Sequence, residues 1–179
     1  ASNGRSFPIG LSRATGLGYI LTGGISPLSR SQGLAIDNIL AFKGIWGNGK
    51  SFELSKPTIS ATQKEKLVWK GLSGAAPFLG IITNLKIKTF PLEELTVWEI
   101  FLSPSKLANT IVHSEKWSNS ASLQWIWGDK IKAYIVINSK DEEALENIFE
   151  LKESLNLSIK TSIKKVSGIH KLPPFSLEN

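Results

Sequence analysis

The feature that most constrains the fold is the order of segments in the second half of the chain. Four stretches there are apolar or alternate between apolar and polar residues, which is typical of β-strands. Two of them, separated by Gly128-Asp129, are the expected arms of a hairpin with a two-residue turn. The four predicted strands are residues 96–102, 123–127, 131–138 and 157–166.

Two helices are predicted between these strands. Ser103 before Pro104 is an expected N-cap with proline in the first turn, so a helix should run from there to about Trp117. Ser139 is the expected N-cap of the second helix, with Glu142 three residues later. Its inward stripe should be Leu145, Ile148, Phe149, Lys152 and Leu155.

The resulting order is β-α-β-β-α-β, which predicts a ferredoxin-like unit: an antiparallel sheet with two helices on one face. The tail from residue 168, which contains Pro173-Pro174, is expected to be extended.

The first half of the chain is less regular. Pro27 and Gly33 bracket an expected short helix. Strands are predicted over residues 38–46 and 50–55, joined by a type I′ turn at Asn48-Gly49.

A helix should follow over residues 60–72, begun by a capping box of Ser60 and Gln63 and ended by the SGAAP stretch. Residues 81–88 alternate and predict a strand that buries Ile81, Thr83, Leu85 and Ile87 on one face.

These patterns predict an α+β protein of two units, residues 1–91 and 92–179, with a boundary near Pro91. The hairpins favour antiparallel or mixed sheets over a doubly wound parallel sheet.

The absence of cysteine excludes disulfides, thiolate catalysis and cysteine-bound metals, and it is consistent with a cytoplasmic protein. No run of 18 apolar residues occurs, so we expect no association with a membrane. The chain also lacks methionine, including an initiator. We therefore expect it to be a piece of a longer protein, although a processed N-terminus would explain the same fact.

Charge is distributed unevenly. Residues 1–91 carry 11 Lys/Arg and 3 Asp/Glu, a net charge of +8, whereas residues 92–179 carry a net charge of −2. A basic half can bind nucleic acid, an anionic ligand or an acidic neighbouring domain, or it can simply aid solubility. Its lysines are scattered and accompany no nucleic-acid-binding motif, so we expect no nucleic-acid partner.

The other chemically suggestive residues are few. His113 and His170 lack metal-ligand spacing and are expected on the surface or in packing, so no metal site is predicted. The tryptophans Trp98, Trp125 and Trp127 can pack in a core or between domains, which we favour, or form a platform for stacking a substrate ring. No residue pattern indicates the catalytic groups.

The glycine-rich segment ATGLGYILTGGIS, residues 14–26, is more informative. Without side chains, successive backbone N–H groups can approach an anion closely, although a packing loop rich in turns would have the same composition. It is not the dinucleotide-binding GxGxxG motif, because Leu21 occupies the sixth position from Gly16.

With its neighbours, this segment resembles a known family. FPIG at residues 7–10, TGLGYILTGGISPLSRSQGLAIDN at 15–38 and LVWKGLSGAAPFLGIITNLKIKTFP at 67–91 are similar to blocks of the FAD-linked oxidases of the vanillyl-alcohol-oxidase type. The berberine-bridge-enzyme-like branch is the most similar. The resemblance implies the second subdomain of an FAD-binding domain, followed by part of a substrate domain.

The family's FAD-contacting positions transfer to the glycine segment and to the GIIT strand. They are Thr15, Gly16, Gly18, Tyr19, Thr22, Gly23, Gly24, Ile25, Ile81 and Ile82. Leu28-Ser29-Arg30 and Asp37-Asn38 match positions that we interpret as structural, the latter as a turn held by side-chain hydrogen bonds.

The resemblance implies a flavin-dependent oxidoreductase with FAD and a small-molecule substrate as ligands. The family's N-terminal FAD subdomain would be a further partner from the same parent chain, and without it the fragment should be inactive. Residues Leu11 and Ser12 stand where many members carry a flavin-linked cysteine, so FAD would not be bound through cysteine. The glycine-poor Leu72–Phe78 departs from the family pattern. It favours an alternative in which the fold is retained for binding or assembly without flavin.

Overall fold

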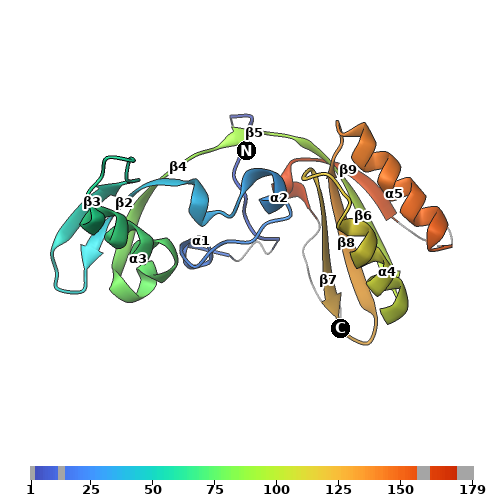
Figure 1. Cartoon of the computed structure of the whole chain (residues 1–179), viewed down its shortest axis with the longest axis horizontal. Helices are drawn as coiled ribbons and strands as arrows, with labels where there is room; N and C mark the ends of the chain where they lie inside the picture. Colours follow the sequence, from blue (N-terminus) through green and yellow to red (C-terminus); the bar gives the residue numbers. More distant parts are fainter. Residues whose placement is uncertain (1–2, 12–14, 157–161, 173–179) are drawn as a thin grey trace.

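Two antiparallel sheets form the two ends of the molecule, with the N-terminal segment between them (Figure 1). The computed structural model describes residues 3–11, 15–156 and 162–172. The first half contains β1 (Arg5–Ser6), α1 (Leu17–Leu21), α2 (Ser29–Gln32), η1 (Ile36–Asn38), β2 (Ile39–Trp46), β3 (Ser51–Ser55), α3 (Gln63–Leu79), β4 (Gly80–Ile87) and β5 (Phe90–Pro91). The second contains β6 (Glu94–Leu102), α4 (Pro104–Ser114), β7 (Ala121–Trp127), β8 (Ile131–Asn138), α5 (Glu142–Ser154), β9 (Ser162–Ser167) and η2 (Ile169–Lys171).

The first sheet has the order β3-β2-β4, and α3 packs on one of its faces. Phe42 of β2 meets Trp69 of α3 edge to face, with ring centroids 4.9 Å apart. The buried cluster extends to α1 and η1 and consists of Leu21, Ile36, Ile39, Phe42, Phe52, Leu72 and Ala76. The first half is therefore built around its own apolar core.

Helix α3 differs from its prediction at both ends. The capping box is formed by Thr62 and Glu65, not by Ser60 and Gln63, because the Thr62 side chain accepts from the Glu65 N–H and the Glu65 carboxylate accepts from the Thr62 N–H. The SGAAP stretch does not end the helix. It introduces a kink at Ser73-Gly74, beyond which helical structure continues to Leu79.

The turn between β2 and β3 is also different from the prediction. Of its residues, Gly49 has a positive φ of 82°, whereas Asn48 does not, so the turn is not type I′. The Trp46 N–H donates to the Lys50 carbonyl at 2.9 Å, which leaves a loop of three residues.

Strand β4 buries only part of the face that its alternation predicts. Ile81 is 70% exposed, and Ile87 is exposed as well. The pairing with β2 shifts register between Lys43 and Gly44, whose partners Asn84 and Ile82 leave Thr83 extra. Leu85 packs against the core as predicted, but the bulge brings Ile82 there in place of Ile81.

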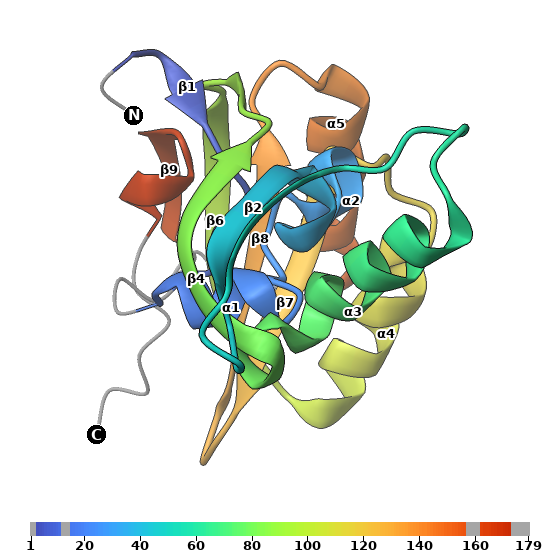
Figure 2. The same ribbon diagram turned by 90° about the vertical axis from the view of Figure 1, so that its left-hand side faces the viewer.

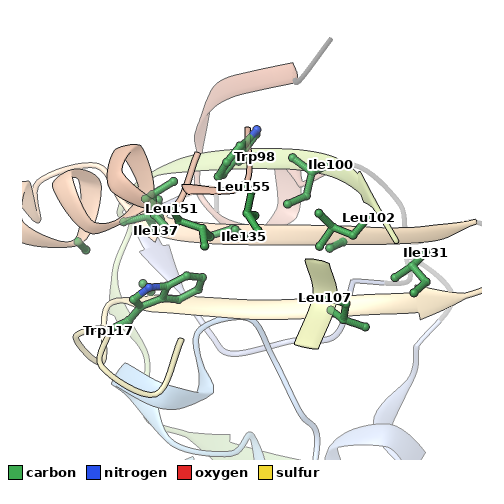
Figure 3. Packing of buried hydrophobic residues seen from close by; sticks show 14 residues of the cluster. Trp98, Ile100, Leu102, Leu107, Trp117, Ile131, Ile135, Ile137, Leu151 and Leu155 are labelled. Carbon is green, nitrogen blue, oxygen red and sulfur yellow. The ribbon is translucent and has the colours of Figure 1, made fainter. Parts of the chain in front are cut away.

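The second sheet confirms the predicted ferredoxin-like unit. Its order is β7-β8-β6-β9, all neighbouring pairs are antiparallel, and α4 and α5 both cover the face directed away from the first half (Figures 1 and 2). Figure 3 shows side chains from this face and from the two helices packed in one layer, among them Trp98, Leu107 and Leu151. The α+β class is therefore confirmed.

Local details of this unit correct the sequence predictions. Asp141, not Ser139, caps α5, because its carboxylate accepts from the Ala144 N–H at 2.9 Å. On the inner face of α5, Ile148 and Leu155 are buried and Leu145 packs against the core as predicted, whereas Phe149 is exposed and Ala144 and Leu151 complete the face. The β7–β8 loop has three residues instead of two, because Trp127 pairs with Ile131.

The C-terminal predictions fall partly outside the described residues. Strand β9 is described from Ser162, so residues 157–161 of the predicted strand are not covered. The predicted extended tail contains a 3-10 turn at Ile169–Lys171, and residues 173–179 lie outside the described part. Among the described residues, no helix has the length and apolar character needed to cross a bilayer.

The N-terminal segment packs on the face of the second sheet that the helices leave free. Ile9, Leu11 and Leu28 contact a cluster whose sheet members are Leu95, Val97, Tyr134 and Val136. Strand β1 pairs with β5, and the Arg5 guanidinium donates to the Thr89 hydroxyl oxygen at 3.1 Å. Residues from both predicted units thus share one cluster, and the boundary near Pro91 stays a prediction.

Candidate functional site

The glycine segment forms a short helix and a turn. Gly16 is the N-cap of α1, Gly18 lies within the helix, and Gly23-Gly24 follow its end with φ values of 132° and 73°. The Tyr19 N–H donates to the Gly16 carbonyl at 3.2 Å, and the Gly23 N–H donates to the Ile20 carbonyl at 3.3 Å. Part of the backbone that was expected to face a ligand is therefore used within the segment.

The lack of a side chain has a different structural consequence at each glycine of this segment. A Cβ at Gly24 would overlap the side chain of the buried Ala35, so packing of the chain itself requires this glycine. Gly16, Gly18 and Gly23 would place a Cβ in open space, with no described atom within 4 Å. The absence of a side chain at Gly16 and Gly18, which do not have positive φ, leaves backbone that another molecule can approach.

Tyr19 and Ile25 hold the two ends of the segment together. The Tyr19 hydroxyl donates to the Ile25 carbonyl, and partial burial raises the pKa of this hydroxyl above its usual value despite that bond. The Thr22 hydroxyl donates to the Gly18 carbonyl at 2.9 Å. The Ile25 side chain is 65% exposed, so the segment presents an apolar group beside a fixed backbone turn.

A cavity of about 430 Å³ lies between this segment and the edge strand of the second sheet. Its volume is in the range of small-molecule sites. The second sheet contributes three consecutive residues of β7, and the N-terminal segment contributes three apolar or aromatic residues. The lining residues are Leu11, Tyr19, Ile25, Leu123, Gln124 and Trp125.

Of the three remaining predicted site residues, Ile81 and Ile82 lie on β4. Ile82 and Ile20 of α1 belong to the same apolar cluster, so the structure joins the glycine segment and β4 in one core. Ile81 points to the other side of the sheet and is exposed. Thr15 is exposed at the start of the segment.

The residues interpreted as structural do have structural contacts. The Asn38 amide donates to the carbonyls of Gln32 and Leu34 at 2.8 and 2.9 Å, and the Asp37 carboxylate accepts from the Leu34 N–H. The predicted turn held by side-chain hydrogen bonds is confirmed. Pro27 lies two residues before the first residue of α2.

Arg30 makes a connection that the sequence did not reveal. Its guanidinium donates to the carbonyls of Trp117 and Ala121, each at 2.9 Å, and to that of Ser114 at 3.4 Å. These carbonyls belong to the last residue of α4, to the loop that follows it and to the first residue of β7. Arg30 therefore ties the N-terminal segment to the second sheet, close to one wall of the cavity.

Two tryptophans are not packed as predicted. Trp98 is buried, which agrees with a core role, but Trp125 is 42% exposed and Trp127 is 63% exposed. Packing in the core is therefore wrong for the β7 pair, and packing between domains stays a prediction. Because β7 is an edge strand, it has a neighbouring strand on one side only, and both rings are left in contact with solvent.

A polar cluster occupies the sheet face opposite the helices. Glu99 and Lys132 form an ion pair at 3.4 Å, and both side chains are about four-fifths buried. Hydrogen bonding with Tyr134 raises the pKa of Lys132, and the Glu99 carboxylate adds to this effect, while burial opposes it. This cluster has no counterpart in the sequence predictions.

No metal centre is present in the described part of the chain. Its His, Asp and Glu side chains form no group that could hold a metal ion, and His113 and His170 are both exposed. The region instead offers a cavity beside glycine backbone that a ligand can approach. FAD fits this region in two respects: the open glycine backbone permits close approach of a phosphate, and exposed Ile25 and Ile81 offer apolar contact.

No family model matches the chain. Among curated proteins, it is 38% identical over 96 residues to berberine bridge enzyme-like 25 from Arabidopsis thaliana, covering 52% of this chain and 17% of that protein. It is 32% identical over 126 residues to a xylooligosaccharide oxidase from Thermothelomyces thermophilus, covering 69% of this chain and 22% of that protein.

Among solved structures, a chitooligosaccharide oxidase matches with a TM-score of 0.77 and 18% identity, over 94% of this chain and 36% of the other. The chain thus spans about a fifth of the length of the curated relatives that it matches. In sequence and in fold, it is similar to one segment of the berberine bridge enzyme-like and other FAD-linked oxidoreductases.

Proposed function

We propose that the parent protein is an FAD-dependent oxidoreductase, to which this chain contributes part of the flavin site and part of the substrate site. The bound flavin would accept a hydride from a C–H bond of a small molecule. The missing N-terminal FAD subdomain would complete the cofactor site, and the chain alone would be inactive.

The observation that carries this proposal is the cavity between the glycine segment and β7. Its two walls come from the two regions that the resemblance assigns to cofactor and to substrate. A cofactor on the glycine wall and a substrate on the sheet wall would meet in it. The positive charge of residues 1–91 supports the same placement, because FAD carries a negatively charged pyrophosphate.

The residues have distinct tasks in this proposal. Gly16 and Gly18 would let the pyrophosphate approach the backbone, and Ile25 would contact an apolar part of the flavin. Tyr19, whose raised pKa keeps its hydroxyl protonated, would hold the turn through its bond to Ile25 and not exchange a proton. Residues of β7 would form the substrate side, and FAD would be held without a bond to cysteine.

Xylooligosaccharides and chitooligosaccharides are named as substrates of two similar proteins. We extend the proposal to a carbohydrate substrate for the parent of this chain. Cytoplasmic location stays a prediction.

Titration with FAD tests the cofactor. Quenching of flavin fluorescence should be measured for this chain and for the full reading frame of its parent. We expect saturable binding by the parent, and weaker binding by the chain, which has half of the cofactor site. A parent that binds FAD no better than an unrelated protein of equal charge would refute the proposal.

One observation favours a second candidate, a binding or assembly domain that keeps the fold without flavin. Backbone groups that a flavin site would use are already engaged within the chain. The Gly16 carbonyl and the Gly23 N–H form hydrogen bonds within the glycine segment, and the backbone of Ala75–Leu79 is helical. This candidate predicts a colourless parent protein, and flavin absorbance in the purified parent would exclude it.

A further inference from the structure

The face of the second sheet that is directed away from α4 and α5 carries two neighbouring rows of side chains. Each row runs across β7, β8 and β6, because the strand register places its members directly opposite one another. The first row is Gln124, Tyr134 and Glu99, and the second, two positions nearer the β7–β8 loop, is Ile126, Lys132 and Phe101. Gln124 also lines the cavity beside the glycine segment, so the rows begin at the wall of the candidate site.

The charges on this face do not balance. One oxygen of the Glu99 carboxylate lies 3.4 Å from the Lys132 Nζ, and the other lies 3.9 Å from the Lys164 Nζ of β9. Among the described strand residues of this face, Glu99 is the only carboxylate, so two ammonium groups share it and one positive charge is left over. Because an ammonium group has three N–H donors and no acceptor, a single carboxylate leaves donors for a further anion.

The surroundings of Lys132 strengthen its attraction for an anion. Its side chain is largely buried, and a charge in such surroundings interacts more strongly with a counterion than a charge in bulk water does. Hydrogen bonding with Tyr134 is the largest cause that raises the pKa of Lys132, so the ammonium group stays charged at neutral pH. Phe101 lies directly opposite Lys132 and is exposed, so an apolar surface adjoins the cation. The face therefore complements a molecule that has an anionic end and an apolar body.

We infer that this face binds the carboxylate of a small organic acid through Lys132 and Lys164. Phe101 and Ile126 contact the apolar part of the molecule, and Glu99 keeps the two ammonium groups close together despite their like charge. As a substrate site this inference rests on the proposed function, because the acid would lie beside the cavity assigned to cofactor and substrate. As an anion site it requires no flavin.

Titration of the purified chain with phenylacetate and with its neutral analogue phenylacetamide, followed by amide NMR shifts, tests this inference. We expect phenylacetate to bind roughly tenfold more tightly, from one charge-assisted hydrogen bond. Lys132→Met should remove this preference. Phe101→Ala should weaken both ligands equally and leave the preference unchanged.

A second variant avoids the partly buried position of Lys132. Lys164→Met should reduce the preference for phenylacetate, and it changes a side chain that is 62% exposed, so the fold should be retained. Lys165→Met is the matched control. Lys165 is 68% exposed, but its register position opposite Thr96 places it on the other face of the sheet.

Equal affinity of the unchanged chain for the two ligands, or an equal effect of Lys164→Met and Lys165→Met, would overturn the inference. Tighter binding of phenethylammonium than of phenylacetate, lost in Glu99→Gln, would also overturn it, because the face would then select cations. The FAD titration separates the two proposals. A preference for phenylacetate without FAD binding by the parent refutes the oxidoreductase alone, whereas FAD binding without this preference refutes the anion site alone.

Discussion

Replacing Arg30 with alanine should loosen the attachment of the N-terminal segment to the second sheet. The guanidinium donates two hydrogen bonds of 2.9 Å and a longer one of 3.4 Å to backbone carbonyls 84 to 91 residues away. A hydrogen bond from a charged donor contributes about 1.5–3 kcal/mol. Because Arg30 is exposed and its side chain loses rotamer freedom, we reduce the sum to about 2 kcal/mol.

For a chain of this size, that loss lowers the melting temperature by roughly 4–8 °C. Thermal unfolding followed by circular dichroism measures it, and hydrogen exchange should increase at residues 114–121. Arg30→Lys should recover less than half of the loss, because an ammonium group cannot reach three divergent carbonyls. Lys116→Ala, which removes an exposed cation from the same loop, is the control. A change below about 0.5 kcal/mol for Arg30→Ala would refute this role.

Three further predictions use other regions. Gly24→Ala should destabilise the chain by about 2–4 kcal/mol in denaturant unfolding, because its φ is positive and Ala35 blocks the Cβ, whereas Gly18→Ala should have little effect; equal effects would contradict the packing reason. The Asp141 pKa is lowered first by the Ser120 hydroxyl and then by the Ala144 N–H. The stabilisation by ionised Asp141 should therefore be complete above its unfolded pKa of about 3.9 and be lost as pH falls through the lower folded pKa. The stability difference between wild type and Asp141→Asn should shrink over that acidic range, and a constant difference down to pH 2 would be inconsistent with it. Ile81→Lys should change stability by less than about 0.5 kcal/mol in thermal unfolding, because the side chain is exposed; a larger loss would show that this face is covered.

The second sheet could be predicted from the sequence almost completely. Its strands and helices have strong local patterns, and the β-α-β-β-α-β order leaves few arrangements open. Helix caps were less predictable, because several Ser, Thr and Asp residues precede each helix. Asp141 replaces Ser139 since its carboxylate also accepts from the Ser118 and Ser120 hydroxyls, which come from another loop.

The candidate site was predictable only in part. The resemblance located the glycine segment and β4, but local patterns cannot show a bulge, and the bulge at Thr83 exposed Ile81 where alternation predicted burial. Burial of Trp125 and Trp127 depends on what packs beside β7, and its position at the edge of the sheet is a tertiary property that local patterns do not show. The bonds of Arg30 join residues more than 80 positions apart, and no periodic signal records such a contact.

Flavin binding by the parent protein tests the central claim most directly. Gly16 and Gly18 have open space around the position of a Cβ, so replacing both with valine should leave the core packing intact while blocking approach to the backbone. We predict that the purified parent shows flavin absorbance, and that the Gly16→Val, Gly18→Val variant folds with unchanged core signals but binds FAD at least tenfold more weakly. FAD binding that is equal in the two proteins, or absent from the parent, would contradict the account.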